Sequence, residues 1–151
     1  MRVWRLADGA PIGQPLRSHT GRVHAVAVGG LPDGTPVIVS GHDDYGDGTV
    51  RVWRLADGTP IGQPLTGHTG AVAAVAVGAL PDGTPVIVSG GGDYRDGTVR
   101  VWRLADGTPL VPPLGLPESV RAVALLGDVI VTATGADIAV HRPAPPRLPC
   151  V

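Results

Sequence analysis

The chain has 151 residues with 12 basic and 13 acidic side chains, which leaves room for one domain and gives a net charge of −1. The sequence contains no basic run or basic face, so nucleic acid and an anionic membrane are not expected as partners. The longest apolar stretch, around residues 71–80, is about half a membrane span. The single cysteine, Cys150, excludes an intrachain disulfide and indicates a reducing, cytoplasmic location.

The expected elements of the first 54 residues are short strands. Apolar side chains alternate in residues 2–6, and Pro15 suits an edge strand because proline donates no hydrogen bond. The next two strands are apolar on both faces, which indicates burial, and Asp33-Gly34 between them predicts a hairpin turn. The predicted strands are residues 2–6, 12–16, 23–28, 37–40 and 49–54.

One segment, Arg-Val-Trp-Arg-Leu-Ala-Asp-Gly, occurs three times, and its tryptophans are Trp4, Trp53 and Trp102, 49 residues apart. A fixed period of this length indicates stacked supersecondary units. Each unit holds four short strands with glycine turns and shows no helical periodicity. The sequence therefore predicts an all-β protein made of β-propeller blades, each with four antiparallel strands.

The units also resemble a known family. Gly67-His68, Ser89-Gly90 and the segment Asp96–Trp102 look like a WD-repeat blade of the bacterial type, and the resemblance covers about residues 2–142. It implies a hydrogen-bonded network of His, Ser or Thr, Asp and Trp inside each blade. The corresponding residues are His19, Ser40, Asp47, Trp53, His68, Ser89, Asp96 and Trp102. The loop before each aspartate is about three residues longer than is usual in the family. Asp44 or Asp93 could therefore take the place of Asp47 or Asp96 in the network.

The expected blades do not close a ring. They comprise a partial blade at 1–16, blades at 17–65 and 66–114, a degenerate last blade at 115–142 and a proline-rich tail at 143–151. Four to eight blades usually close a propeller, whereas this count gives about three. Met1 stands where Val50 and Val99 stand in the other repeats. We therefore expect the C-terminal part of a longer propeller protein, or else a short chain that completes a ring by self-association.

No catalytic set or cofactor motif is evident. Ser40, His19 and Asp47 could form a triad, but the same residue types repeat in the next blade, which favours a structural role. No zinc pattern exists, and the loop at residues 42–48 lacks the glutamate that a calcium loop requires. We expect no enzyme activity, no cofactor and no metal.

Differences between the two copies suggest a partner surface. Residues 2–50 and 51–99 differ at nine positions. Seven of these lie in or next to two loops, the one that leads into the first strand of a blade and the one that joins its second and third strands, and both loops emerge on the same face of the blade. Tyrosine and arginine are frequent at binding hot spots, so the tyrosines of these loops join the set. The predicted partner surface is Arg17, Arg22, His24, His42, Asp43, Tyr45, Tyr94 and Arg95.

The WD-repeat resemblance implies a non-catalytic scaffold for protein–protein interaction that forms the C-terminal fragment of a larger signalling or regulatory protein. Bacterial relatives of this kind often lie C-terminal to a signalling ATPase, kinase or protease module. The alternative is a ligand-binding or enzymatic propeller. That alternative would need polar residues outside the repeat pattern, and only His24, His42 and Asp43 meet this condition.

Overall fold

The computed structural model describes residues 1–17, 21–44, 47–92 and 97–142, and all thirteen elements in these ranges are β-strands. They form four separate antiparallel sheets, which confirms the expected all-β class and the four-stranded blades. The N-terminal hairpin consists of β1 (Val3–Trp4) and β2 (Pro11–Ile12). The first complete blade contains β3 (Arg22–Gly30), β4 (Pro36–Asp44), β5 (Asp47–Arg54) and β6 (Leu65–His68). The second complete blade contains β7 (Val72–Ala79), β8 (Pro85–Gly92), β9 (Gly97–Arg103) and β10 (Leu114–Leu116). The last blade contains β11 (Ala122–Leu126), β12 (Val129–Ala133) and β13 (Ile138–His141).

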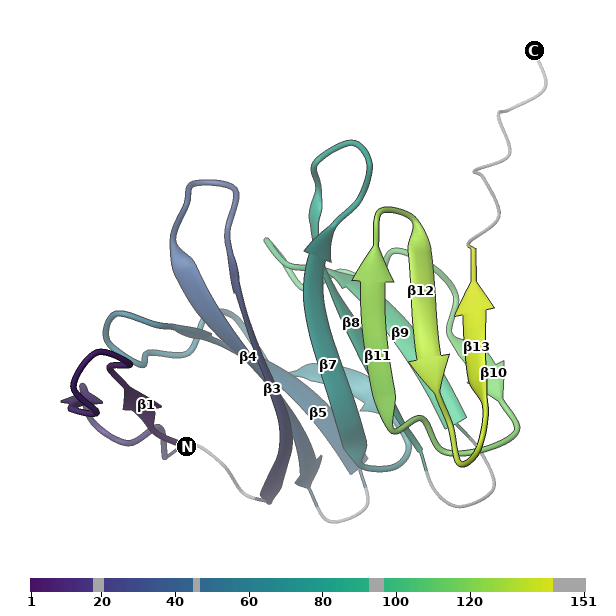
Figure 1. Cartoon of the computed structure of the whole chain (residues 1–151), viewed down its shortest axis with the longest axis horizontal. Helices are drawn as coiled ribbons and strands as arrows, with labels where there is room; N and C mark the ends of the chain where they lie inside the picture. Colours follow the sequence, from purple (N-terminus) through teal and green to yellow (C-terminus); the bar gives the residue numbers. More distant parts are fainter. Residues whose placement is uncertain (18–20, 45–46, 93–96, 143–151) are drawn as a thin grey trace.

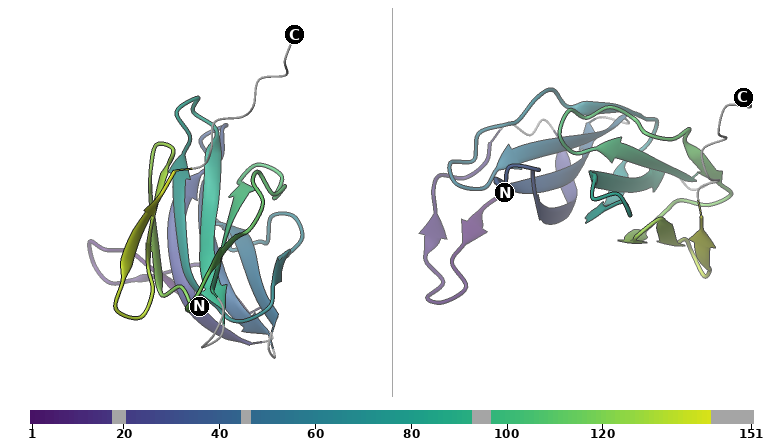
Figure 2. Two further views of the ribbon diagram at one scale, coloured as in Figure 1. Left: turned by 90° about the vertical axis from the view of Figure 1, so that its right-hand side faces the viewer. Right: turned by 90° about the horizontal axis from the view of Figure 1, so that it is seen from above.

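The blades follow one another in an open arc (Figure 1). Their first strands, β3, β7 and β11, lie side by side along the inner wall of the arc, and the later strands of each blade lie farther out. Seen from above, the N-terminal hairpin stands at one end and the last blade at the other (Figure 2). The ring is therefore not closed within one chain.

Neighbouring blades pack through valine and leucine side chains. Val75 and Val77 of β7 face backwards onto a core that includes Val37 and Val39 of the first complete blade. One blade further on, Leu125 of β11 packs in the same way onto the second complete blade. Burying a side chain of this size stabilises the fold by about 1.5–3 kcal/mol, so these interfaces hold the arc together.

Two glycines allow the inner strands to approach closely. Val77 lies against Gly29, where an added Cβ would overlap the Val77 side chain. A Cβ added at Gly78 would lie 2.7 Å from Leu125 Cδ2. The repeat therefore places a glycine on the front face of β3 and β7, opposite a large side chain on the rear face of the next inner strand.

The structure differs from the expected boundaries at two points. Gly67 and His68 lie in β6, where His68 pairs with Gly48, so they end the first complete blade rather than begin the second. The outer strand expected at residues 12–16 is the shorter β2, in which Ile12 pairs with Val3. The proline-rich tail at 143–151 lies outside the described residues.

The last blade ends the arc with a free edge. Gly127 and Asp128 form the tight turn predicted from the sequence, since Leu126 pairs directly with Val129. β13 is the outermost strand of this sheet, and no fourth strand covers it among the described residues.

Candidate functional site

The second complete blade contains a buried polar network. Trp102 Nε1 donates a hydrogen bond to Ser89 Oγ over 2.8 Å, and His68 Nε2 lies 2.8 Å from the same oxygen. His68 Nδ1 lies 3.1 Å from Thr98 Oγ1. The network joins the outer strand of one blade to two strands of the next, because His68 belongs to β6 and its partners belong to β8 and β9.

Burial and the positive charge of Arg100 lower the pKa of His68 from 6.5 to about 4. The imidazole is therefore neutral at pH 7, and each ring nitrogen faces a hydroxyl group. Ser89 is fully buried beneath the indole, so a substrate would have to open the blade to reach its oxygen. This geometry stabilises the fold and gives no accessible nucleophile.

In the first complete blade, the histidine that contacts the network serine among the described residues is His42 of β4. Trp53 Nε1 donates to Ser40 Oγ over 2.8 Å, and His42 Nε2 lies 2.6 Å from that oxygen. The prediction that His42 lies on a partner surface is wrong, because it is fully buried. Ser40 and His42 are two residues apart on β4, so their side chains share the buried face of the sheet.

Several residues of the expected network lie outside the described part of the chain. They are His19, Asp96 and its alternative Asp93, together with the side chains of Asp47 and Asp44. Sequence reasoning missed His42 and Thr98 as network members. The alternation of side chains along β4, starting from Ser40, was the signal that could have identified His42.

The last blade retains a reduced form of the network. Thr132 Oγ1 lies 3.1 Å from His141 Nε2. Ile130 pairs with His141 as Ile87 pairs with Trp102, so His141 occupies the tryptophan position of the repeat. A hydroxyl on the second strand and a nitrogen-bearing ring on the third are thus common to all three blades.

The arginine that follows each tryptophan has a local role. Each one pairs with the aspartate three residues later, over 2.9, 3.6 and 3.3 Å in chain order. The three pairs are Arg5–Asp8, Arg54–Asp57 and Arg103–Asp106. All are about half exposed, so each contributes little to stability and mainly orients an outer turn.

The predicted loop surface is only partly described. Arg17, Arg22 and His24 are exposed, and Asp43 is half-buried. Arg22 pairs with Asp43 in the strand register, at the end of the sheet where β4 meets β5. Tyr45, Tyr94 and Arg95 lie outside the described residues.

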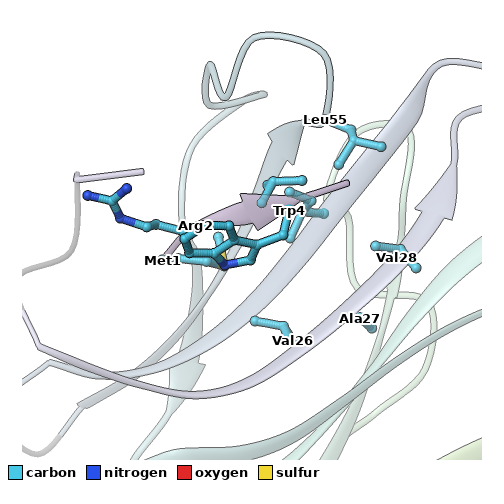
Figure 3. Close-up of a pocket in the computed structure, with 9 residues that line it drawn as sticks. Met1, Arg2, Trp4, Val26, Ala27, Val28 and Leu55 are labelled. Atoms are coloured by element: carbon cyan, nitrogen blue, oxygen red, sulfur yellow. The ribbon is translucent and has the colours of Figure 1, made fainter. Parts of the chain in front are cut away.

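The open N-terminal end of the arc carries an apolar groove of about 320 Å³. β1 forms one wall and the rear face of β3 forms the other, and Trp4, Val26 and Val28 line the space between them (Figure 3). Trp4 is 57% exposed, whereas its repeat equivalents Trp53 and Trp102 are 1% and 3% exposed. The Arg2 guanidinium lies 5.9 Å from the centre of the Trp4 ring, which gives the groove one cationic group.

The valines of this groove are exposed copies of buried residues. Val28 is 70% exposed, although Val77, which occupies the same repeat position, packs against the preceding blade. Val26 is likewise exposed, whereas Val75, at the same repeat position, packs against the preceding blade. Sequence reasoning recognised the first blade as incomplete but did not assign a binding site to its open side.

The described residues give no sign of a metal site or a membrane-spanning helix. They contain no group of three His, Cys, Asp or Glu residues that could hold a metal ion. No helix long and apolar enough to cross a membrane occurs within the same ranges.

Comparison with known proteins identifies the family. The family model described as WD domain, G-beta repeat matches residues 10–54 and 58–103, which is more than half of the chain. The chain therefore belongs to the WD-repeat family. Domains of this family are generally protein-interaction scaffolds and usually have no catalytic activity. None of the curated proteins matches the sequence significantly.

Among solved structures, the designed Ika4 protein supports the fold, and two others show weaker similarity. The computationally designed Ika4 protein is 23% identical with a TM-score of 0.59, and the match covers 90% of this chain and 99% of Ika4. The designed Ika8 protein is 19% identical with a TM-score of 0.44, over 94% of this chain and 52% of Ika8. Chaetomium thermophilum Sqt1, bound to the N-terminus of ribosomal protein L10, is 20% identical with a TM-score of 0.48, over 76% of this chain and 31% of Sqt1.

Proposed function

We propose that the chain is a non-catalytic scaffold that binds a protein partner at the open N-terminal end of its arc. The observation that carries this proposal is the exposure of Trp4, Val26 and Val28, whose repeat equivalents are buried against a neighbouring blade. Exposed apolar patches on a folded domain mark interaction sites. The single cysteine, Cys150, supports a cytoplasmic location for this scaffold.

The composition of the groove favours a polypeptide partner. Its walls combine an aromatic ring, aliphatic side chains and the arginine Arg2, a combination that is enriched at the centres of protein interfaces. Covering each of the two valines would contribute up to about 1.5–3 kcal/mol. Together with Trp4, these residues supply the apolar centre that a specific interface requires.

The loop surface is the second candidate. Arg17, Arg22 and His24 are exposed there, and all three differ from the residues at the same positions in the next repeat. This surface could add charged contacts at the rim of an interface, where they affect association rate and specificity more than affinity.

An affinity-capture experiment tests the proposal. Tagged wild-type chain, a Val28→Asp variant and a Leu126→Asp variant would be incubated with a lysate of the source cells, and captured proteins quantified by mass spectrometry. Both substituted side chains are exposed apolar groups at opposite ends of the arc, so both variants should fold. We expect a partner that wild type and Leu126→Asp retain and that Val28→Asp loses at least tenfold. Loss with Leu126→Asp and retention with Val28→Asp would contradict the proposal.

A further inference from the structure

The groove occupies the position that two strands hold in a complete blade. β1 pairs with β2 as β5 pairs with the segment that directly follows it, since Trp4 lies opposite Pro11 and Trp53 lies opposite Pro60. β1 is therefore equivalent to the third strand of a blade. In the complete blades the inner side of that strand pairs with β4 or β8, whereas no strand of the described part of the chain lies on this side of β1.

Trp4 lacks the hydrogen bond that its equivalents make. Trp53 and Trp102 donate to Ser40 and Ser89, which belong to the neighbouring second strand, over 2.8 Å in each case. Trp4 Nε1 has no such acceptor among the described residues, and the Arg2 guanidinium lies over its ring. A strand added beside β1 would restore the network if it carried a hydroxyl side chain at the serine position.

Val28 sets a second requirement for an occupant. Val77, its repeat equivalent, fits against the preceding blade only because Gly29 leaves room for it. Leu125 of the last blade likewise fits against the second complete blade because Gly78 has no side chain. An inner strand that covers Val28 in the same way must therefore carry glycine opposite that side chain.

We propose that the groove binds a β-hairpin of the blade type from the partner protein. The outer strand of the hairpin pairs with the free edge of β1 and offers a serine or threonine hydroxyl to Trp4 Nε1, while the inner strand places a glycine against Val28. This inference rests on the proposed function and specifies the partner's chemistry. Main-chain pairing supplies affinity in such strand addition, and the side-chain pockets supply specificity.

The chain's own C-terminal hairpin, β11 and β12, is not free to occupy the groove, because β12 already pairs with β13 on the side that would have to face β1. Thr132 on β12 occupies the serine position, but Leu126 occupies the position of Gly29 and Gly78, because it pairs with Val129 as Gly78 pairs with Val86. Leu126 is 81% exposed at the far end of the arc. In the repeat geometry its side chain would overlap Val28, so a second copy of the chain is a poor occupant.

A fluorescence titration tests this assignment. The probe is a synthetic peptide with the sequence of residues 71–92, flanked by lysines for solubility, which contains Gly78 and Ser89 but no tryptophan. Binding should shift the emission of the wild-type chain to shorter wavelength, because Trp4 is the exposed tryptophan. A matched peptide with Gly78→Leu should bind at least about tenfold more weakly, because overpacking costs a factor of that size.

Two control chains complete the experiment. Val28→Asp should lose binding of the unsubstituted peptide, and Leu126→Asp, whose substituted side chain is exposed at the far end of the arc, should bind it as the wild type does. Equal binding of both peptides, no binding of the unsubstituted peptide, or equal loss of binding in Val28→Asp and Leu126→Asp would overturn the assignment. If the peptide fails while captured protein still depends on Val28, the proposed function stands and only the hairpin assignment falls.

Discussion

Replacing Trp102 by alanine is expected to lower the free energy of unfolding by about 3–5 kcal/mol, the range for removal of a large buried aromatic ring. Trp102 is 3% exposed, belongs to the core between the two complete blades and donates a hydrogen bond to Ser89. The substitution removes this packing and also leaves a buried hydroxyl with one partner fewer. Urea unfolding followed by circular dichroism would measure the change.

Trp4→Ala is the matched control for this prediction. Trp4 has the same sequence neighbours as Trp102, yet it is more than half exposed and its indole makes no hydrogen bond with the described residues. We expect a loss of less than about 1 kcal/mol, the usual size for an exposed side chain. Equal losses for Trp4→Ala and Trp102→Ala would show that Trp4 of the N-terminal hairpin is as buried in solution as Trp102, which would contradict the structure.

Acidification should destabilise the protein between pH 6.5 and about 4. The pKa of His68 is lowered to about 4 by burial and by Arg100, whereas an unfolded chain has a histidine pKa near 6.5. Below pH 6.5 the unfolded state binds a proton that the folded state does not, so stability is complete above pH 6.5 and falls as the pH decreases. The loss should total about 3 kcal/mol and end near pH 4.

Two variants isolate this effect. His68→Gln should cost stability at pH 7 but remove about 3 kcal/mol of the stability loss between pH 6.5 and 4, while His24→Gln, at an exposed position, should leave that loss unchanged. Hydrogen bonds from Thr59 and Thr108 hold the pKa values of Asp57 and Asp106 below 3.8, so these carboxylates add their own loss of stability only at the acid end of this range, and that loss is the same in both variants. If His68→Gln kept the wild-type slope, His68 would be protonated in the fold.

Much of the fold could be predicted from the sequence because the repeat is nearly perfect. The spacing of Trp4, Trp53 and Trp102 and the turn dipeptides Asp33-Gly34 and Gly127-Asp128 identify four-stranded units and their hairpins. These signals are local, since they depend on neighbouring residues and on the period of the chain. The structure places the strands accordingly.

The binding site could not be predicted in the same way. Val28 and Val77 have almost the same sequence environment, and their different exposure depends only on whether another blade lies behind them. His42 was misplaced because its repeat equivalent is Gly91, and a difference between copies was interpreted as a surface signal. The structure shows that this difference lies in the buried network beside Ser40.

The open N-terminal end is the central claim, and hydrogen exchange of the three indole N–H groups tests it most directly. In ¹⁵N-labelled protein at low concentration, Trp53 and Trp102 should exchange slowly because their N–H groups are buried and bonded to Ser40 and Ser89. Trp4 should exchange at close to the rate of a free indole, and it should become protected when the hairpin peptide is added. Slow exchange of all three indoles in the free protein would contradict the account.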